Sequence, residues 1–340
     1  MAQQGKKKKK KGRLIAIFFA ELLLLLLIFA GFKIYTSMNK LNRNNQDDSQ
    51  IQKNVEVKVD GYRNIVLFGV DSRENRLKDS THSDTIIIAS INNKTKDVRL
   101  ASVYRDTYVN IPDIGYKKIN AAYFNGGYSL ALTTINKNFD LDTSEYVTVN
   151  FEAVVKVVDL LGGITLDVQD DELHYLNGYV NSLNKINGTN VAHLKSAGTQ
   201  LVNGTQACAY SRIRYTAGGD FKRTERQRIV VQKIFDKVKN SNLATINAII
   251  NEMFPQILTN LSNTEILGLA KDVLSYSIAE QTGFPFEKDA HTYDKVSYVF
   301  PIDLAANVTE LHKYLFDEAN YVPSATVQEY SSYIESIRVK

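Results

Sequence analysis

The sequence predicts an α/β protein in which an α/β/α layered domain surrounds a central, mostly buried sheet, preceded by one N-terminal transmembrane helix. Segments dense in Val, Ile and Leu alternate with stretches of helical periodicity, which is the pattern of layered α/β domains. A hydrophobic share of 44% in 340 residues is enough for a packed core in one large or two ordinary domains. One apolar run near the N-terminus has the length that a helix needs to cross a bilayer.

The N-terminal segments predict how the chain meets the membrane. Leu14–Phe32 is an apolar run with a single charged residue, and six lysines and Arg13 precede it. The positive-inside rule therefore predicts a cytoplasmic tail over residues 1–13, a transmembrane signal anchor over 14–34 and an extracellular C-terminal domain. The alternative is a cleaved signal peptide, which the long apolar run and the lack of a clear A-x-A site disfavour. The polar segment 35–59 predicts an extracellular linker.

Charge and cysteine content narrow the function classes. The net charge of +4 comes from the basic tail, so the rest of the chain is slightly acidic, which argues against a general nucleic-acid binder. Cys208 is the only cysteine of the sequence, which excludes an intramolecular disulfide and a multi-cysteine zinc site. Neither the charge nor the cysteine content indicates an oligomeric state.

The main predicted domain spans residues 60–240. It opens with three runs whose density of branched apolar residues predicts central strands, over 64–71, 85–92 and 98–105. The patterns that follow predict helices over 116–138, 151–161, 203–209 and 223–238, and strands over 146–149 and 164–168. An acidic patch over 167–172 predicts a solvated turn.

Residues 241–340 are either the C-terminal part of this domain or an extension to it. Their pattern predicts mostly helical structure over 243–277, a strand over 295–302 and a helix over 305–318. Beyond residue 321 we expect an accessory helix or a loose end.

A cluster of basic residues marks the candidate site. Tyr210–Arg228 holds six arginines and lysines around a Thr-Ala-Gly-Gly turn, which is typical of a site for phosphate or another polyanion. Arginine suits such a site because its planar guanidinium holds phosphate oxygens in pairs and keeps its charge. If residues 211–215 are extended, Arg212 and Arg214 point to the same side.

The second half of this cluster predicts a helix whose inner face has a polar head. Asp220 is a candidate N-cap after the two glycines. Helical spacing places Arg223 and Gln227 on the face that carries the apolar residues further along, so we expect both to point inward at the helix N-terminus, where backbone N–H groups favour anions. The alternative is a solvated basic face with partial pairing of Glu225 and Arg228.

Two carboxylates are candidate metal ligands. Asp71 ends the first predicted strand and Asp84 precedes the second, so an antiparallel pairing of these strands brings them together. Mg²⁺ takes one or two carboxylates and completes its shell with water and substrate phosphate. Turn capping by the two aspartates is equally consistent with the sequence.

Three more residues extend this candidate site. Arg105 and Asp106 close the third predicted strand, and Lys118 begins the helical pattern after it. Arg105 and Lys118 are candidates to bind the polyanion, and Asp106 is a candidate to orient an arginine. A surface ion pair, which contributes little to stability, is the alternative.

Six motifs together resemble the LytR-CpsA-Psr family of Gram-positive envelope proteins. They are NIVLFGVDSR (64–73), SDTIIIASIN (83–92), SVYRDTYV (102–109), KINAAY (118–123), GGITLDV (162–168) and YSRIRYTAGGDFKRTERQR (210–228). The match runs in continuous order over about residues 64–238. A single membrane anchor with an external domain is also a feature of that family.

The resemblance implies an α/β/α catalytic domain that binds a polyprenyl pyrophosphate lipid, with its tail in an apolar tunnel and its phosphates among arginines. It implies a Mg²⁺-assisted phosphotransferase that moves a teichoic acid, capsule or similar glycopolymer from its undecaprenyl-pyrophosphate carrier to peptidoglycan. The expected partners are therefore this lipid-linked glycopolymer, peptidoglycan and membrane lipid, and not nucleic acid. The alternatives are a non-catalytic polyprenyl-phosphate or glycan-binding sensor or scaffold, and a transcriptional attenuator, which the predicted topology disfavours.

The resemblance also assigns roles to individual residues. Asp71 and Asp84 match the family's Mg²⁺-associated aspartates, where Mn²⁺ can substitute. The phosphate-contacting positions match Arg105, Lys118, Arg212, Arg214, Arg223 and Gln227. From these roles we hypothesise that Mg²⁺ and the arginines neutralise the pyrophosphate, and that Asp84 or Asp106 accepts the proton of the attacking hydroxyl. Many relatives have arginine where this chain has His82, which is neutral much of the time near pH 7, and Arg73 is a candidate to compensate.

Overall fold

A seven-stranded mixed sheet is the centre of the protein, in a computed structural model that describes residues 42–43, 50–54, 59–70, 77 and 81–339. The strands follow the order β1 (Asn42–Arg43), β10 (Ile257–Thr259), β7 (Glu145–Asn150), β2 (Tyr62–Val70), β3 (Ser83–Asn92), β4 (Asp97–Val103) and β11 (Ser277–Phe284). Strands β2, β3 and β4 pair antiparallel in chain order, whereas β7 and β11 pair parallel with β2 and β4. The central strands β2, β3 and β4 carry branched apolar side chains that are mostly buried on both faces of the sheet, as the sequence predicted.

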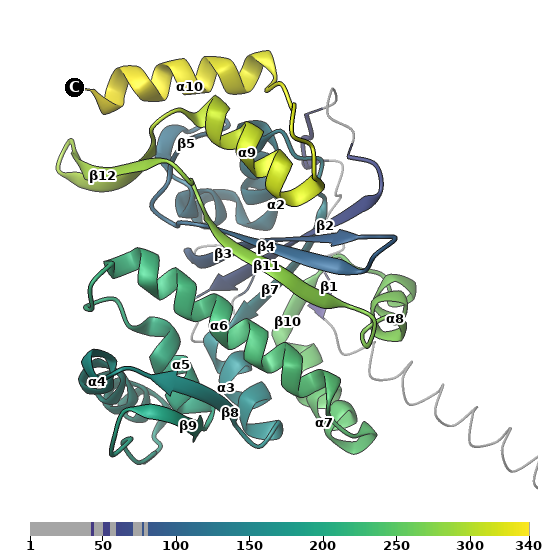
Figure 1. Cartoon of the computed structure of the whole chain (residues 1–340), viewed down its shortest axis with the longest axis vertical. Helices are drawn as coiled ribbons and strands as arrows, with labels where there is room; N and C mark the ends of the chain where they lie inside the picture. The colour runs from purple at the N-terminus through teal and green to yellow at the C-terminus, as the bar shows by residue number, and fades with distance from the viewer. Residues whose placement is uncertain (1–41, 44–49, 55–58, 71–76, 78–80, 340) are drawn as a thin grey trace, which may run out of the picture. The chain divides into compact units, whose positions relative to one another are not determined.

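One face of the sheet is covered by α2 (Asn120–Phe139), α9 (Leu304–Phe316) and α10 (Ala325–Arg338), as Figure 1 shows. Two hairpins lie on the same side. They are formed by β5 (Tyr108–Ile111) with β6 (Gly115–Lys118), and by β12 (Lys288–Tyr293) with β13 (Val296–Pro301). The largest hydrophobic core lies between these elements and the sheet.

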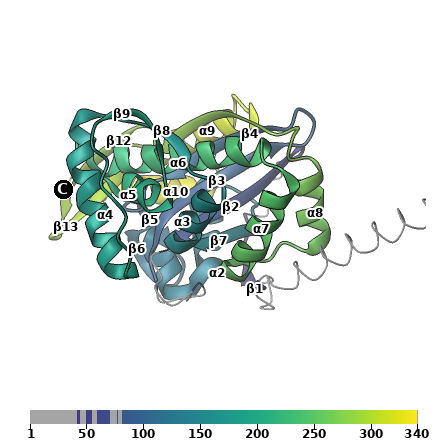
Figure 2. The same ribbon diagram turned by 90° about the horizontal axis from the view of Figure 1, so that it is seen from below.

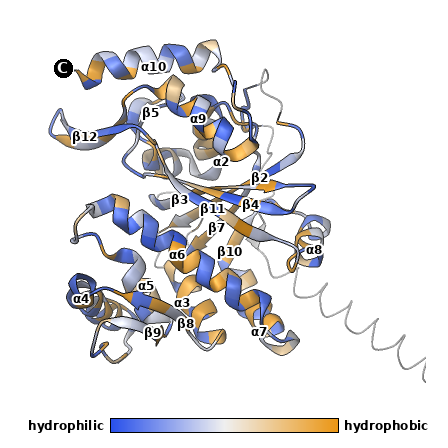
Figure 3. Ribbon diagram, viewed as in Figure 1, coloured by the Kyte–Doolittle hydropathy of each residue, from blue (hydrophilic) through white to orange (hydrophobic). Residues whose placement is uncertain are grey.

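The other face is covered by α6 (Gly219–Lys239), which runs along the sheet in both views (Figures 1 and 2). Hydrophilic and hydrophobic residues alternate along helix α6 (Figure 3). A second core lies among α6, α3 (Phe151–Leu160), α4 (Asp170–Asn187), α5 (Gly204–Arg212), β8 (Ile164–Val168) and β9 (Gly198–Val202). The remaining elements on this side are α7 (Leu243–Met253), the 3₁₀ turn η2 (Phe254–Gln256) and α8 (Asn263–Lys271).

Two elements predicted between residues 108 and 172 differ from the structure. The helix predicted over 116–138 begins only at Asn120, because residues 115–118 pair with residues 108–111 in the β5–β6 hairpin. The solvated turn predicted over 167–172 is wrong, because Asp170 begins α4. The side chains of Gln169 and Glu172 form a capping box there, so the acidic residues occupy the first helical turn, where the helix dipole favours them.

Residues 241–340 add a strand to each half of the main sheet. Strand β10 pairs antiparallel with β7, and β11 pairs parallel with β4 at the opposite edge. The helical structure predicted over 243–277 is therefore interrupted by β10. The predicted strand over 295–302 corresponds to β13, the predicted helix over 305–318 to α9, and the segment beyond residue 321 forms helix α10.

The basic tail and the signal anchor predicted at the N-terminus lie outside the described residues. In the part of the chain that the structure describes, no helix is both long and apolar enough to cross a membrane. Part of the predicted linker packs on the domain: Ile51 is 6% exposed in the main core. Beside it, the amide of Asn136 donates to the carbonyl oxygen of Gln52 at 3.2 Å. Residues 50–54 therefore belong to the folded domain.

Candidate active site

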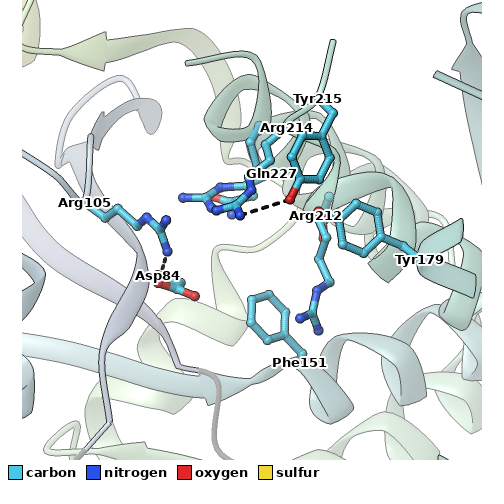
Figure 4. Close-up of a pocket in the computed structure, with 10 residues that line it drawn as sticks. Asp84, Arg105, Phe151, Tyr179, Arg212, Arg214, Tyr215 and Gln227 are labelled. Carbon is cyan, nitrogen blue, oxygen red and sulfur yellow. Dashed lines mark hydrogen bonds and ion pairs between the residues drawn. The ribbon is translucent and has the colours of Figure 1, made fainter. Parts of the chain in front are cut away.

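A pocket of about 310 Å³ lies at the N-terminal end of α6 (Figure 4). Four arginines and one carboxylate line it, together with aromatic and neutral polar side chains. These residues come from the end of the sheet, from α3, α4, α5 and α6, and from the segment after α5. The lining residues are Asp84, Arg105, Phe151, Tyr179, Ser211, Arg212, Arg214, Tyr215, Arg223 and Gln227. The excess of positive charge makes the pocket suited to a polyanion.

The sheet contributes Asp84 and Arg105 to the pocket. Asp84 lies at the start of β3, where pairing with β2 shifts register, and such a bulge redirects a side chain at the end of a strand. Arg105 follows the end of β4, and its Nη1 donates to Oδ1 of Asp84 at 2.7 Å. Burial acts against the charge of Arg105, but attraction to Asp84 and Asp220 raises the pKa of Arg105. This guanidinium therefore remains a cation in the pocket.

Helix α6 places Arg223 and Gln227 in the pocket, as their spacing predicted, and each is 7% exposed. The helix begins after Gly218, whose φ of 88° lies in the left-handed region that favours glycine. The prediction that Asp220 is the N-cap is wrong, since it lies in the first helical turn. Its Oδ2 instead accepts a hydrogen bond from Nη2 of Arg223 at 2.8 Å and lies 3.5 Å from Nε of Arg105.

The guanidinium groups of Arg105 and Arg223 form a cationic pair around Asp220. Burial lowers the pKa of Arg223, and the neighbouring Arg105 acts in the same direction, while Asp220 opposes them. The Nε atoms of both arginines are buried and have no hydrogen-bond partner among the described residues. Buried donors of this kind are costly, so a bound anion would stabilise this pair.

Arg212 and Arg214 enter the pocket from the end of α5. Arg212 is the last residue of this helix, so the prediction of an extended segment over 211–215 is wrong at its start. The chain leaves the helix at Ile213, which is extended, and both arginines line the pocket nonetheless.

Aromatic rings support both of these arginines. The guanidinium carbon of Arg212 lies 5.3 Å from the ring centre of Phe151 and 5.9 Å from that of Tyr179. That of Arg214 lies 5.2 Å from the ring centre of Tyr215, and its Nη2 donates to the Tyr215 hydroxyl at 3.1 Å. These contacts hold the two cations at the pocket wall without neutralising them.

Arg226 has a structural role. It is 3% exposed and does not line the pocket. Its Nε donates to Glu172 on α4 at 2.7 Å, its Nη1 to the carbonyl of Ile213 at 2.9 Å and its Nη2 to the hydroxyl of Thr216 at 2.6 Å. The residue therefore ties α6 to α4 and to the segment that carries Arg214.

The solvated basic face considered as an alternative is limited to one exposed pair. Lys222 contacts Glu225 at 2.9 Å with both side chains about half exposed. Arg228 is buried, with 8% of its surface exposed, and burial lowers its pKa.

Asp106, Lys118 and His82 lie near the pocket but do not line it. Nζ of Lys118 is 3.1 Å from Oδ1 of Asp106, and the same oxygen is 3.8 Å from Nε of Arg105. The structure therefore brings the predicted Arg105, Asp106 and Lys118 together, but only Arg105 lines the pocket. The exposed ring of His82 stacks on Phe124 with a centroid distance of 4.7 Å.

The predicted metal ligands can be placed only in part, because Asp71, like the phosphate-binding candidate Arg73, lies outside the described residues. The predicted antiparallel pairing is present: Val70, directly before Asp71, pairs with Ser83, directly before Asp84. One oxygen of Asp84 accepts from Arg105, and its carboxylate faces the pocket (Figure 4). No group of three His, Cys, Asp or Glu side chains suitable for a metal occurs within the described ranges. A single carboxylate facing the pocket is a donor that Mg²⁺ can use, because this ion takes one or two carboxylates and completes its shell with water and substrate phosphate.

An apolar pocket of about 260 Å³ adjoins the first. The two pockets share the lining residues Phe151, Ser211 and Gln227. Beyond these, the lining consists mainly of apolar side chains from β2, β3, β7, α3 and α6: Leu67, Phe68, Ile87, Val147, Val149, Val154, Val230, Val231 and Ile234. The inner face of α6 is therefore polar at its head and apolar further along, as its sequence pattern predicted.

Sequence reasoning missed two kinds of residue in this site. Asp220 was assigned to helix capping, although an acidic residue between the predicted phosphate-binding arginines Arg214 and Arg223 also signals a counter-charge. Tyr179 and Tyr215 were not considered. Tyr215 adjoins Arg214 in the sequence, but Tyr179 is on the helix that was not predicted.

Comparisons with known proteins agree with this geometry. The model of the LytR_cpsA_psr family matches residues 28–313. The polyisoprenyl-teichoic acid–peptidoglycan teichoic acid transferase TagU of Enterococcus faecalis is 30% identical over 275 residues, which cover 78% of this chain and 86% of TagU.

Two solved structures share the fold. TagT bound to LIIa-WTA matches with a TM-score of 0.63 at 24% identity, over 83% of this chain and 100% of that one. The family protein YwtF (TagT) with bound octaprenyl pyrophosphate lipid matches with a TM-score of 0.58 at 24% identity, over 80% of this chain and 97% of that one. The resemblance inferred from the motifs is confirmed: the chain belongs to the LytR-CpsA-Psr family.

Proposed function

We propose that this protein is a phosphotransferase that attaches an undecaprenyl-pyrophosphate-linked glycopolymer, such as a teichoic acid or a capsule, to peptidoglycan. The observation that carries the proposal is the arginine-lined pocket with an apolar pocket beside it. The related TagU is named as a teichoic acid–peptidoglycan transferase, and a related TagT structure holds octaprenyl pyrophosphate, which supports the same ligand class.

A lipid pyrophosphate matches the two pockets in chemistry and order. Its phosphates take the positions facing the four arginines that line the pocket. Two of these arginines, Arg105 and Arg223, each have a buried Nε without a hydrogen-bond partner among the described residues. Its isoprenoid chain enters the apolar pocket between α6 and the sheet, where mainly apolar side chains line the walls. We further propose that the predicted signal anchor over 14–34 holds the domain at the extracellular membrane surface, next to this lipid.

The reaction is a displacement at phosphorus. The hydroxyl oxygen of a peptidoglycan sugar attacks the phosphorus atom that carries the glycopolymer, and the bond from this atom to the bridging oxygen breaks, so that undecaprenyl phosphate leaves. Positioning and charge neutralisation supply most of the catalysis in such reactions. The four arginines lining the pocket neutralise the charge that develops on the phosphate oxygens.

The proton of the attacking hydroxyl needs an acceptor. Of the two candidate carboxylates, only Asp84 lines the pocket, and we assign the proton to it. Asp106 contacts Lys118 and Arg105 behind the pocket, so we assign it to positioning these cations. We also propose that Asp84, together with Asp71, holds Mg²⁺. The ion would neutralise phosphate charge there and would leave the arginine contacts in place.

The test is transfer from a polyprenyl-pyrophosphate-linked glycopolymer to peptidoglycan fragments by the purified chain. Arg212→Ala and Arg105→Ala each remove a cation from the pocket, and we expect each to lower the rate by about 100-fold or more. Lys222→Ala is the matched control, because it removes a cation from α6, the helix that carries Arg223, at a position that is about half exposed and does not line the pocket, and the rate should stay within twofold of the parent.

The same variants test the ligand. The parent protein, purified from a host that makes undecaprenyl lipids, should retain such a lipid detectable by mass spectrometry, and Arg212→Ala should retain much less. Wild-type transfer by both arginine variants would falsify the proposed phosphate site.

A further inference from the structure

Helix α8 and the turn after it carry apolar side chains that stay open to solvent. None of the nine residues of α8 is buried by the rest of the described chain. Leu267 on the helix is 45% exposed, and Leu274 in the following turn is 70% exposed. Ala270 between them is also exposed, and Ile266 and Val273 are partly exposed. We call these five residues the α8 surface.

Core packing accounts for only part of this helix. Leu269 packs against a core cluster on the α6 side of the sheet. Leu267 and Leu274 gain no such contact, although large apolar residues are usually buried. Apolar side chains that cluster on the surface of a folded domain indicate a contact with a membrane or another molecule.

The α8 surface and the arginine pocket lie at opposite ends of the main sheet. Asp84 lies at the start of β3 and Arg105 follows β4, whereas Lys96, in the turn between these strands, contacts Asp272 directly after α8 at 2.8 Å. The ten residues of β3 separate the two ends by about 33 Å. In Figures 1 and 2, α8 accordingly lies on the side of the molecule away from α4 and the β12–β13 hairpin.

The proposed anchor joins the domain at the α8 end. The eight residues 35–42 connect the end of the anchor to Asn42, and a fully extended chain of this length spans roughly 28 Å at most. Asn42 pairs with Leu258 in β10, and β10 leads directly into α8, which begins at Asn263. The length of the chain therefore keeps the α8 end of the sheet close to the bilayer.

Apolar side chains connect the apolar pocket with α8. Four residues line this pocket and also belong to the core cluster that Leu269 joins: Leu67, Ile87, Val147 and Val231. Helix α6 runs in the same direction, because it places Arg223 in the arginine pocket, while Nζ of Lys239 at its other end donates to the carbonyl of Tyr276 shortly after α8 at 2.7 Å. A lipid chain that runs from the arginine pocket between α6 and the sheet therefore leads toward α8.

We propose that the α8 surface docks on the outer leaflet of the bilayer, so that the isoprenoid chain passes from the bilayer to the apolar pocket beside it. This inference rests on the proposed function and its anchor. Exposed leucines are stabilised when they leave water for the boundary of the acyl chains, which is where short apolar helices lie on a membrane. The anchor keeps the bilayer within reach of every copy of the chain, whereas a second copy would have to be met by diffusion.

The first test measures whether the α8 surface enters the bilayer. The full chain is reconstituted in vesicles of phosphatidylglycerol and phosphatidylethanolamine, with a fluorophore on Leu274→Cys. The only native cysteine, Cys208, is buried, so the added thiol is the reactive one. Lipids that carry a nitroxide on the acyl chain should quench this fluorophore by roughly twofold or more, because interfacial helices lie about 5–10 Å deep.

Val296→Cys is the matched control for this label. Val296 is 39% exposed in the β12–β13 hairpin, which lies at the pocket end, since the N–H of Val299 in the same strand donates to the carbonyl of Asp106 at 2.9 Å. The nitroxide lipids should leave its fluorescence nearly unchanged. Absence of quenching at Leu274→Cys would overturn the docking. Shielding of that label only at high protein-to-lipid ratio, without quenching by the lipids, would overturn it as well and assign the surface to a second copy.

The second test asks whether docking serves the reaction. Leu267→Glu combined with Leu274→Glu puts two charges on the α8 surface, and transfer from an undecaprenyl-linked donor in vesicles should fall by roughly three- to tenfold, because the lipid and the pocket lose their alignment. Transfer from a water-soluble donor with a short isoprenoid chain should stay within twofold of the parent. Val296→Glu should match the parent with both donors. An unchanged rate with the vesicle donor, or an equal loss with both donors, would contradict the proposed route.

Failure of the proposed function or of the anchor is distinguishable from failure of the docking. Without the proposed activity, the parent would transfer glycopolymer from neither donor, while quenching at Leu274→Cys would still report on the bilayer. Without the anchor, alkaline carbonate would release the parent from the vesicles. A parent that resists carbonate and transfers from both donors, with a label at Leu274→Cys that stays in water, overturns the docking alone.

Discussion

The carboxylate of Asp220 shows how single residues prepare the pocket for an anion. It contacts Nη2 of Arg223 at 2.8 Å and lies 3.5 Å from Nε of Arg105, so one negative charge holds a guanidinium from α6 beside one from the sheet. Without it, the two guanidinium groups would lack a carboxylate that contacts both of them. Asp84 and Asp220 together offset two of the four arginine charges that line the pocket, which leaves net positive charge for the ligand.

Asp220→Asn tests this balance. The change removes the counter-charge and keeps the side-chain volume, so in the absence of ligand we expect the free energy of unfolding to fall by about 1–2 kcal/mol, between the values for exposed and buried pairs. Added inorganic pyrophosphate should raise the stability of the variant more than that of the parent, because the anion replaces the missing charge. Urea unfolding with and without pyrophosphate measures both.

Glu225→Gln provides the comparison for Asp220→Asn. It removes the carboxylate of the exposed Lys222–Glu225 pair on the same helix, so stability should change by less than about 0.5 kcal/mol and pyrophosphate should act as on the parent. Equal stability of Asp220→Asn and the parent without ligand would contradict the role given to Asp220.

At the scale of elements, the arginine pocket depends on how α4, α5 and α6 are held together. Arg226 makes three hydrogen bonds of 2.6–2.9 Å that reach Glu172 on α4 and two residues of the segment after α5. That segment carries Arg214 and Tyr215. Arg226 therefore positions pocket residues from outside the pocket.

Arg226→Lys tests whether Arg226 acts through its three hydrogen bonds or only through its positive charge. Lysine keeps the positive charge but cannot make three diverging hydrogen bonds, so the carbonyl of Ile213 and the hydroxyl of Thr216 lose a partner. Because the site is almost fully buried, we expect a loss of about 2–4 kcal/mol in the free energy of unfolding. Thermal and urea unfolding check the stability, and pyrophosphate binding should weaken as well. Unchanged binding with lowered stability would show that Arg226 stabilises the fold without positioning Arg214.

The elements that sequence reasoning found and missed differ in a physical way. Strands β2, β3 and β4 are buried on both faces and so must be made of branched apolar residues, which a sequence displays directly. Strand β11 pairs on one edge only and is largely exposed, so its sequence SIAEQTGF carries no such pattern. Helix α4 begins with three acidic residues that resemble a loop unless the capping box of Gln169 and Glu172 is recognised.

The sequence predicted those site residues whose position follows from residue type and local spacing. The inward direction of Arg223 and Gln227 follows from helical period, and both line the pocket. The contact of Asp220 with Arg105 joins residues far apart in the chain, so it depends on the packing of α6 on the sheet and not on local pattern. For the same reason, the sequence did not place Tyr179 beside Arg212.

At the scale of the whole molecule, the C-terminal part supports the site through the edge of the sheet. Strand β11 pairs with β4, and the backbone N–H of Tyr104 donates to the carbonyl of Phe284 at 3.0 Å. The Tyr104 side chain, 8% exposed, lies over Gly283 so closely that a Cβ there would come within 2.1 Å of its hydroxyl. Arg105 is the next residue along the chain, so the position of β11 affects a pocket residue.

Gly283→Ala tests this long-range support. The added methyl group cannot fit without moving Tyr104 or β11, and overpacking of this kind costs about 1–3 kcal/mol of stability. The shift should also displace Arg105 and lower the glycopolymer transfer rate by roughly ten- to a hundredfold. Gly268→Ala in α8 is the matched control: its Cβ meets nothing within 4 Å, so it should raise stability by about 0.5–1 kcal/mol and leave the rate unchanged. If Gly283→Ala lost stability but kept the parent rate in enzyme that is still folded, the C-terminal part would serve to complete the sheet and would not position Arg105.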